Sequence, residues 1–167
     1  MPLPNSFLTF QIGITEPRRV AVTTLATRVA EEQNTQLGRR VGYSIRFDEC
    51  FLRNQTKIKY MTEGILIREM MEDPLLKSYS VIILDEAHER TAQTDIIMGL
   101  LKKVLRKRRD LRLIVSSATV DAEYIRDFFT DEESLQGKAG MVTNSVFLIN
   151  LTHSKVFCDI GLKHLLI

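Results

Sequence analysis

The sequence YSVIILDEAHER, residues 79–90, contains the feature that decides the fold. Its four consecutive aliphatic residues, 81–84, are typical of a strand buried on both faces of a parallel sheet. The run ends directly in two carboxylates, Asp85 and Glu86. Open α/β sheets bind their ligands in the crevice beyond the carboxyl ends of their strands. The stretch therefore predicts an α/β fold with an acidic ligand site after this strand.

The two carboxylates suit a magnesium ion and a phosphate substrate. Mg²⁺ takes oxygen ligands and usually keeps several waters, so one carboxylate beside substrate phosphates is enough to hold it. Asp85 fits this metal-binding role, and Glu86 is a candidate catalytic residue that orients or deprotonates a water for attack on a γ-phosphate. The alternative is purely structural, because Asp85, Glu86 and Glu89 would also stabilise the N-terminal end of a following helix.

Composition limits the class of protein only in part. The chain has 167 residues, 44% of them hydrophobic, which is enough for one domain with a real core and is unlike a disordered chain. Lys and Arg total 23 against 21 for Asp and Glu, so nucleic-acid binding must come from local patches. The two cysteines are far apart, and no Cys/His cluster indicates zinc or a disulfide framework. We expect a soluble intracellular chain without membrane association, since no apolar run reaches a spanning length.

Hydrophobic periodicity predicts further elements around the central strand. We expect residues 48–55 to form a loop and the lysine-rich side of the helix at residues 95–109 to be a solvated face rather than a nucleic-acid patch. The predicted strands are residues 12–14, 41–47, 57–61 and 111–115; the predicted helices run from Pro17 to about Gln33, from residues 62–64 to 73–74, over residues 95–109, and from a cap at Asp121 through Ile125, Phe128 and Phe129.

Several motifs occur together in a recognisable order. DEAHER at residues 85–90 and SAT at residues 117–119 resemble motifs II and III of the DEAH-box ATP-dependent RNA helicases. The resemblance covers about residues 13–129 and is greatest to the helicases associated with pre-mRNA splicing. It implies a RecA-like fold of the P-loop NTPase type, a mostly parallel sheet flanked by helices, with ATP, Mg²⁺ and RNA as ligands. Further matching stretches are VGYSIRF at 41–47, IKY at 58–60, DP at 73–74 and DFF at 127–129.

The resemblance also implies roles for individual residues in nucleotide chemistry. Asp85 would hold Mg²⁺ beside ATP, and Glu86 would activate the attacking water. His88 joins Glu86 as a catalytic candidate, and together with Ser117 and Thr119 it would couple hydrolysis to movement of the RNA strand. Taken alone, Ser-Ala-Thr is only a small-residue loop, so the family pattern carries this assignment.

Two further motifs imply contacts with the RNA backbone. TEPRR at residues 15–19 resembles motif Ia and places Arg18 and Arg19 at a helix start, where free N–H groups and the helix dipole attract phosphate. TEG at residues 62–64 resembles motif Ib and adds Thr62, although the family more often has Asp at the middle position. Without the resemblance, the two arginines are ordinary solvated residues and Thr62 is a helix N-cap.

Two parts of the family pattern do not occur in these 167 residues. There is no G-x-x-x-x-G-K-[ST] loop to cradle phosphates, and no second RecA-like domain with its arginine fingers. We therefore expect residues 12–129 to be a partial first RecA-like domain, incomplete at its N-terminal side. Residues 1–11 are then a divergent lead-in and residues 130–167 a divergent tail. Such a chain is expected to be inactive alone.

The missing phosphate-loop strand has a structural consequence. In the RecA-like fold we expect it beside the strand at residues 81–84, so its absence predicts a gap, filled in part by the lead-in or by residues 146–151. A non-catalytic module that binds RNA or a partner protein is the alternative function, whereas an unrelated ATPase sharing only the Asp-Glu turn is disfavoured by the other motifs. The resemblance further implies spliceosomal or other ribonucleoprotein partners and a nuclear location.

Overall fold

The computed structural model describes residues 11–117, 125, 128–129, 139–143 and 146–149. Its helices are α1 (Arg19–Glu32), α2 (Glu63–Glu72) and α3 (Ala92–Lys107), with one 3₁₀ turn, η1 (Ala87–Glu89). Its strands are β1 (Gln11–Glu16), β2 (Val41–Ile45), β3 (Asp48–Cys50), β4 (Ile58–Thr62), β5 (Tyr79–Leu84), β6 (Arg112–Ser116), β7 (Ala139–Thr143) and β8 (Val146–Ile149).

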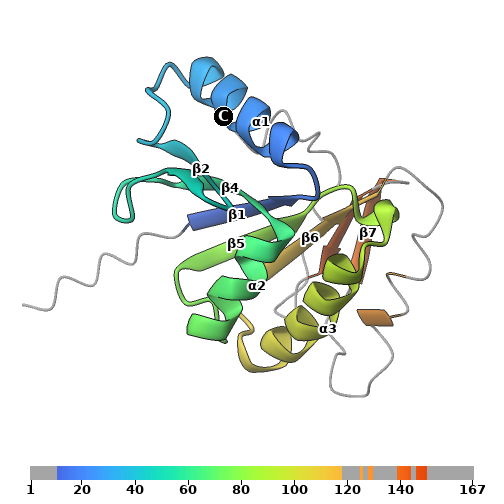
Figure 1. Cartoon of the computed structure of the whole chain (residues 1–167). Helices are drawn as coiled ribbons and strands as arrows, with labels where there is room; N and C mark the ends of the chain where they lie inside the picture. The colour runs from blue at the N-terminus through green and yellow to red at the C-terminus, as the bar shows by residue number, and fades with distance from the viewer. Residues whose placement is uncertain (1–10, 118–124, 126–127, 130–138, 144–145, 150–167) are drawn as a thin grey trace, which may run out of the picture.

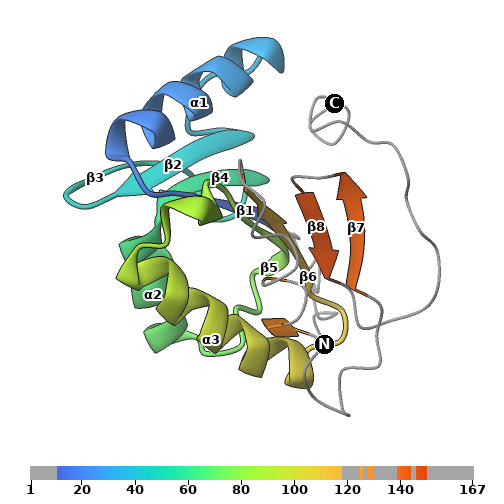
Figure 2. The same ribbon diagram turned by 90° about the vertical axis from the view of Figure 1, so that its right-hand side faces the viewer.

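The described strands form one sheet in the order β3-β2-β4-β1-β5-β6-β8-β7. Strands β2, β4, β1, β5 and β6 are parallel to one another, whereas β3 is added antiparallel at one edge and β8 and β7 are added antiparallel at the other. Helix α1 covers one face of the sheet, and α2 and α3 cover the other (Figures 1 and 2). This three-layer arrangement confirms the predicted α/β, mostly parallel fold and is consistent with a RecA-like domain.

The aliphatic run of β5 lies at the centre of the sheet. Ile82 pairs with Gly13 of β1 on one side and with Leu113 of β6 on the other. Successive side chains of a strand point to opposite faces, and Ile82 packs in the core under α2 and α3 while Ile83 packs in the core under α1. The sequence prediction that this strand is buried on both faces is confirmed.

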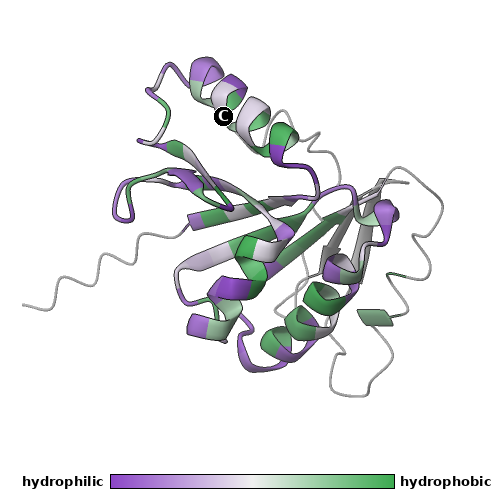
Figure 3. Ribbon diagram, viewed as in Figure 1, coloured by the Kyte–Doolittle hydropathy of each residue, from purple (hydrophilic) through white to green (hydrophobic). Residues whose placement is uncertain are grey.

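The two cores arise from amphipathic helices on a hydrophobic sheet. In Figure 3, hydrophobic and hydrophilic segments alternate along α3, as expected for a helix with one buried face. Its residues Ile97, Leu101 and Leu105 are almost completely buried against the sheet. On the opposite face, Val22 and Ala26 of α1 are fully buried. The predictions of a helix at residues 17–33 and of another at residues 95–109 are confirmed, although the helix ends differ.

Several predicted boundaries are wrong, each for a local reason. Residues 48–50, predicted as loop, form β3, because the chain reverses after Ile45 through a turn in which Phe47 adopts φ 68°. No Gly or Asn marks this turn in the sequence. Helix α3 begins at Ala92 rather than at residue 95, because the Thr91 hydroxyl oxygen accepts a hydrogen bond from the Thr94 N–H at 2.9 Å and caps it.

The expected gap beside the Asp85 strand does not exist. Strand β5 has β1 and β6 as its two neighbours, because the crossover through α2 leads from β4 past β1 to β5 and the crossover through α3 places β6 beside β5. Tail residues do join the sheet as predicted, but β8 pairs with β6, with Leu113 opposite Ile149. Strand β1 begins at Gln11, one residue before the predicted strand at residues 12–14. Residues 1–10 and Asp121 lie outside the described residues.

Candidate functional site

The predicted site residues gather at one edge of the sheet. Parallel strands end at the same edge, which is where open α/β sheets bind ligands. Strand β1 ends at Glu16, β4 ends at Thr62, β5 ends directly before Asp85, and β6 ends at Ser116. Sequence positions up to a hundred residues apart therefore contribute side chains to one place.

Asp85 is held in a fixed orientation at this edge. Its N–H donates to the Thr15 carbonyl oxygen at 3.1 Å, which extends the β1–β5 pairing by one residue. Its Oδ1 accepts a hydrogen bond from the Glu86 N–H at 2.9 Å and another from the Ser116 hydroxyl. Because the side chain is only half-buried, the carboxylate is oriented by the protein and still accessible from the crevice.

Glu16 is the most perturbed carboxyl group at the site. It is buried at the end of β1, with 3% of its surface exposed, and is hydrogen-bonded to Asp85. Burial, reinforced by that bond and by the negative charges of Asp85, Glu86 and Glu89, raises the pKa of Glu16 to about 8. Near neutral pH Glu16 is therefore mainly protonated, and its carboxyl proton can be donated to Asp85.

The DEAH turn has a strained backbone. Glu86 and Arg90 adopt left-handed conformations with φ 54° and 46° on either side of η1, a region that residues other than Gly occupy at a cost of roughly 1–2 kcal/mol. The turn brings the Glu86 carboxylate to His88, whose Nε2 lies 3.2 Å from Glu86 Oε2. The two candidate catalytic residues, Glu86 and His88, are therefore direct partners.

The residues present fit a magnesium ion held mainly by water and phosphate. Within the described part of the chain, no group of three or more His, Cys, Asp or Glu side chains is arranged to hold a metal ion. A closed protein cage is therefore not formed there. A single oriented carboxylate such as Asp85 is the usual protein contribution when substrate phosphates complete the Mg²⁺ ligands.

One of the two motif Ia arginines, Arg18, contacts the DEAH turn. Arg18 is the N-cap residue of α1, and its side chain, 77% exposed, forms an ion pair with Glu89 of η1 at 2.8 Å. The exposed Arg19 donates from Nη2 to the Arg46 carbonyl oxygen at 2.8 Å. Pro17 was expected at the first helical position and is found two residues before it. Both arginines are accessible at a helix N-terminus, as the phosphate-binding prediction requires.

Thr62 and Glu63 connect motif Ib to the start of α3. Thr62 is the N-cap residue of α2, as its structural interpretation predicted, but its side chain makes no capping hydrogen bond. Glu63 is buried, and its carboxylate accepts hydrogen bonds from the Thr91 hydroxyl at 2.6 Å and from the Thr94 hydroxyl. The residue at the variable middle position of motif Ib therefore ties α2 to the residue that follows the DEAHER sequence.

We predict that Glu63→Ala lowers the free energy of unfolding by about 1–3 kcal/mol, because the substitution leaves the Thr91 and Thr94 hydroxyls without their carboxylate. Urea denaturation followed by circular dichroism measures the change. The matched control is Glu72→Ala, which removes an exposed carboxylate from the last turn of the same helix and is expected to change stability by less than about 0.5 kcal/mol. Equal effects of the two substitutions would contradict the linking role of Glu63.

The remaining predicted residues lie at the end of β6. Ser117 follows the strand and is buried, whereas Thr119 lies outside the described residues. Ser116, which sequence reasoning left without a role, is the serine that contacts Asp85. Glu16 was missed as well. Both could have been found by asking which polar residues end the strands next to β5.

An α/β sheet that holds an oriented acidic pair beyond its central strand is typical of nucleotide-hydrolysing domains. Residues 14–128 match the DEAD/DEAH box helicase family, which is more than half of the chain. The chain therefore belongs to the DEAD/DEAH box helicase family.

Three curated relatives match about three quarters of this chain. The probable ATP-dependent RNA helicase DHX35 of Homo sapiens is 62% identical over 123 residues, which cover 74% of this chain and 18% of the relative. Its counterpart from Pongo abelii is also 62% identical over 123 residues, covering 74% and 17%. The DHX35 homolog of Caenorhabditis elegans is 59% identical over 124 residues, again covering 74% and 17%. The chain thus spans less than a fifth of the length of these relatives.

The described helices α1, α2 and α3 have 14, 10 and 16 residues. None of them combines the length and the apolar character needed to cross a membrane.

Proposed function

We propose that this domain serves an ATP-dependent RNA helicase of the DEAH-box type, in which ATP hydrolysis drives remodelling of RNA or ribonucleoprotein. The observation that supports this most is a contact between the nucleotide half of the site, at the DEAH turn, and the RNA half, at the start of α1. The ion pair from Arg18 to Glu89 at 2.8 Å joins the candidate RNA contact to the DEAH turn. Family membership and the similarity to relatives named as probable ATP-dependent RNA helicases support the same proposal.

The nucleotide half of the site would work through oriented carboxylates. When bound, Mg²⁺ would neutralise charge on the phosphates of ATP. Asp85 would hold this ion through the oxygen that Ser116 and the Glu86 N–H leave accessible. Protonated Glu16 would hold Asp85 from the buried side by its hydrogen bond. Glu86 would orient and deprotonate the attacking water, with His88 fixing the carboxylate at 3.2 Å.

The RNA half would hold the backbone without reading the sequence. Arg18 and Arg19 would contact phosphates at the N-terminus of α1, and Thr62 would add a contact at the N-terminus of α2. A phosphate bound by Arg18 competes with Glu89 for the same guanidinium. RNA binding would in this way alter the DEAH turn, and His88, Ser117 and Thr119 would pass the change between nucleotide and RNA. Spliceosomal or other ribonucleoprotein partners and a nuclear location belong to this proposal.

A non-catalytic module that binds RNA or a partner protein is the second candidate function. The specific observation in its favour is that the 167 residues contain no G-x-x-x-x-G-K-[ST] sequence. In that case Arg18, Arg19 and Thr62 would keep their role, and Glu86 would have none.

We predict that the Arg18→Ala, Arg19→Ala double variant binds single-stranded RNA more weakly and with a smaller salt dependence. Each lost phosphate contact reduces the slope of log K against log salt by about 0.7 for a single strand. Fluorescence anisotropy with a labelled oligonucleotide of mixed sequence, over a series of salt concentrations, measures this slope. An unchanged slope would move the RNA site elsewhere, with the basic face of α3 as the next candidate.

A matched control makes the same change of net charge at positions outside the candidate RNA site. The Arg28→Ala, Arg39→Ala double variant removes two exposed arginines, of which Arg28 pairs with Glu32 on α1 at 3.0 Å. Its salt slope is expected to equal that of the parent chain. A reduction as large as that of the first double variant would mean that RNA binding follows net charge alone.

A further inference from the structure

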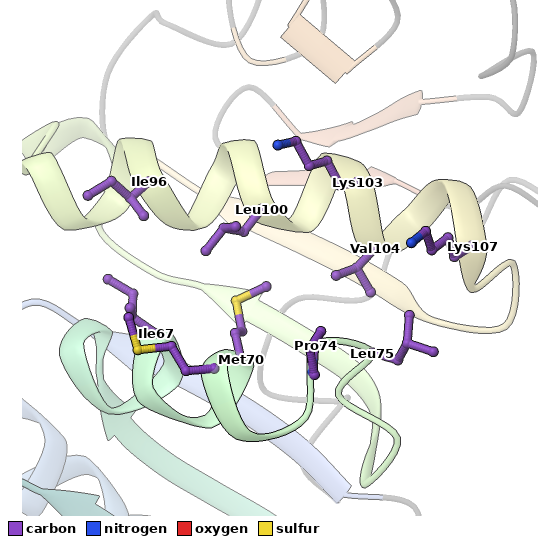
Figure 4. A pocket seen from close by; sticks show the side chains of 10 residues that line it. Ile67, Met70, Pro74, Leu75, Ile96, Leu100, Lys103, Val104 and Lys107 are labelled. Atoms are coloured by element: carbon purple, nitrogen blue, oxygen red, sulfur yellow. The ribbon is translucent and has the colours of Figure 1, made fainter.

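A groove of about 370 Å³ lies between α2 and α3, on the face of the sheet opposite α1 (Figure 4). Its walls are mainly aliphatic and thioether side chains, and none of the residues that line it is aromatic or acidic. The apolar lining residues include Ile67, Met70 and Met71 on the α2 side and Ile96, Leu100 and Val104 on the α3 side.

The groove leaves large hydrophobic side chains in contact with solvent. Met71 is 78% exposed on one wall, and Ile96 is 52% exposed on the other. Single exposed apolar residues are normal on a protein surface, but apolar residues gathered around a concave site are typical of binding surfaces. The groove therefore has the shape and the chemistry of a site for an apolar group.

The charge of the groove is positive. Lys103 and Lys107 both line the α3 wall, one helical turn apart, and both are exposed. Among the described residues, neither ammonium group has a hydrogen-bond or ion-pair partner. By contrast, the neighbouring Lys102 donates to the Phe128 carbonyl oxygen at 2.5 Å, and Glu69 of α2 is occupied by Lys59 at 2.5 Å. Two positive charges thus border an apolar floor.

We propose that this groove binds an amphipathic, acidic α-helix of a partner protein. The α3 wall from Ile96 to Lys107 is about 16 Å long at a rise of about 1.5 Å per residue, which matches three turns of a partner helix. Apolar side chains at i, i+3 or i+4, and i+7 of that helix would fill the space between Met70 and Leu100. Its carboxylates would pair with Lys103 and Lys107.

The groove is separate from the nucleotide and RNA edge. It begins at Ile67, more than one turn along α2 from Thr62, and extends along the helices away from the strand ends. Nucleic acid is a poor match for it, because single-stranded nucleic acid binds by stacking bases on aromatic side chains in a positively charged channel. A protein helix can therefore occupy the groove while Arg18 and Arg19 remain accessible.

The test uses a designed probe and the complete 167-residue chain. The probe is a fluorescein-labelled 16-residue helical peptide with leucines at i, i+3, i+7 and i+10 and glutamates at the flanking positions. The matched probe carries lysines in place of the glutamates. Fluorescence anisotropy is expected to show saturable binding of the acidic peptide at least about tenfold tighter than that of the basic peptide, a difference of about 1.4 kcal/mol.

Variants of the chain separate the apolar and the charged contributions. Leu100→Glu is expected to weaken binding of the acidic peptide at least about tenfold, and the Lys103→Glu, Lys107→Glu double variant is expected to reverse the preference toward the basic peptide. Ile96→Glu, at a half-exposed position, replaces Leu100→Glu if circular dichroism shows that the latter does not fold. The control is Val20→Glu, which adds the same charge at a 76% exposed position of α1 on the opposite face and is expected to leave binding unchanged.

Four results would overturn the proposal. One is equal binding of the two peptides by the parent chain, and another is acidic-peptide binding that neither Leu100→Glu nor Ile96→Glu weakens. The other two indicate a different occupant. Self-association in light scattering that Met71→Glu abolishes would assign the groove to a second copy, and displacement of the peptide by single-stranded RNA would assign it to nucleic acid.

Discussion

A polypeptide of these 167 residues is expected to hydrolyse ATP no faster than buffer, with or without RNA. Asp85 and Glu86 are positioned at the strand edge, but the sequence provides no phosphate loop to cradle the triphosphate. An arginine finger, which in this family comes from a second domain, contributes on the order of 10³–10⁵ in the rate of related phosphoryl transfers. Release of phosphate from purified chain, measured with a coupled assay at saturating ATP and Mg²⁺, checks this expectation.

Glu86→Gln is the control for this experiment. The substitution keeps the size and most of the hydrogen bonding of the side chain but removes the base that would activate water. Parent and variant are expected to give the same background rate. RNA-stimulated turnover in the parent that Glu86→Gln abolishes would contradict the prediction and would show that a phosphate site exists which the sequence pattern does not reveal. A contaminating ATPase would instead give equal activity in both samples.

The sequence predicts the central layer of this fold well because burial leaves a strong pattern. The run at residues 81–84 is typical of a strand buried on both faces, and the structure places Ile82 and Ile83 in opposite cores. The amphipathic stripe of α3 is similarly informative. Both signals are local, because they depend on the hydrophobic residues and on the repeat of about 3.6 residues in a helix or 2 in a strand. They do not depend on which elements become neighbours in the fold.

Neighbour relations were harder to predict because they depend on the path of the chain. The sequence predicted the missing phosphate-loop strand beside β5, which is wrong, because no local pattern indicates that β6 lies there. The contacts of Asp85 with Ser116 and of Glu63 with Thr91 span 31 and 28 residues. Turn conformations such as that of Phe47, with φ 68° at a bulky residue, also go against local preference.

At the site, too, residues within a local motif could be predicted from the sequence, whereas residues brought in by the path of the chain could not. The DEAH motif could be recognised from the sequence alone, and the structure places Asp85, Glu86 and His88 in one turn. The residues that support them, Glu16 and Ser116, have no motif of their own that names a function. Their importance comes from ending the strands on either side of β5, because this places their side chains against Asp85. Glu16 is the one whose influence can be measured directly in this chain.

Glu16→Gln is expected to stabilise the chain at neutral and alkaline pH and to remove a pH dependence of stability. The pKa of Glu16 is raised from 4.5 to about 8 in the folded chain, first by burial and then by Asp85. Between these values the folded state holds a proton that the unfolded state has lost, so stability decreases as pH rises, by up to about 1.4 kcal/mol per pH unit. The contribution is fully present below about pH 4.5 and is lost as pH rises through 8.

Glutamine at position 16 has nearly the same shape as protonated glutamic acid, and its amide N–H can donate to Asp85 at every pH. The parent and Glu16→Gln are therefore expected to be equally stable near pH 4.5 and to differ by about 3 kcal/mol at pH 7, with the variant more stable. Urea denaturation at pH 5, 6, 7 and 8 gives the two curves. Glu31→Gln, on the exposed face of α1, is the control and should follow the parent at each pH. If the Glu16→Gln curve also runs parallel to the parent, Glu16 does not hold the proton that orients Asp85 in the folded chain.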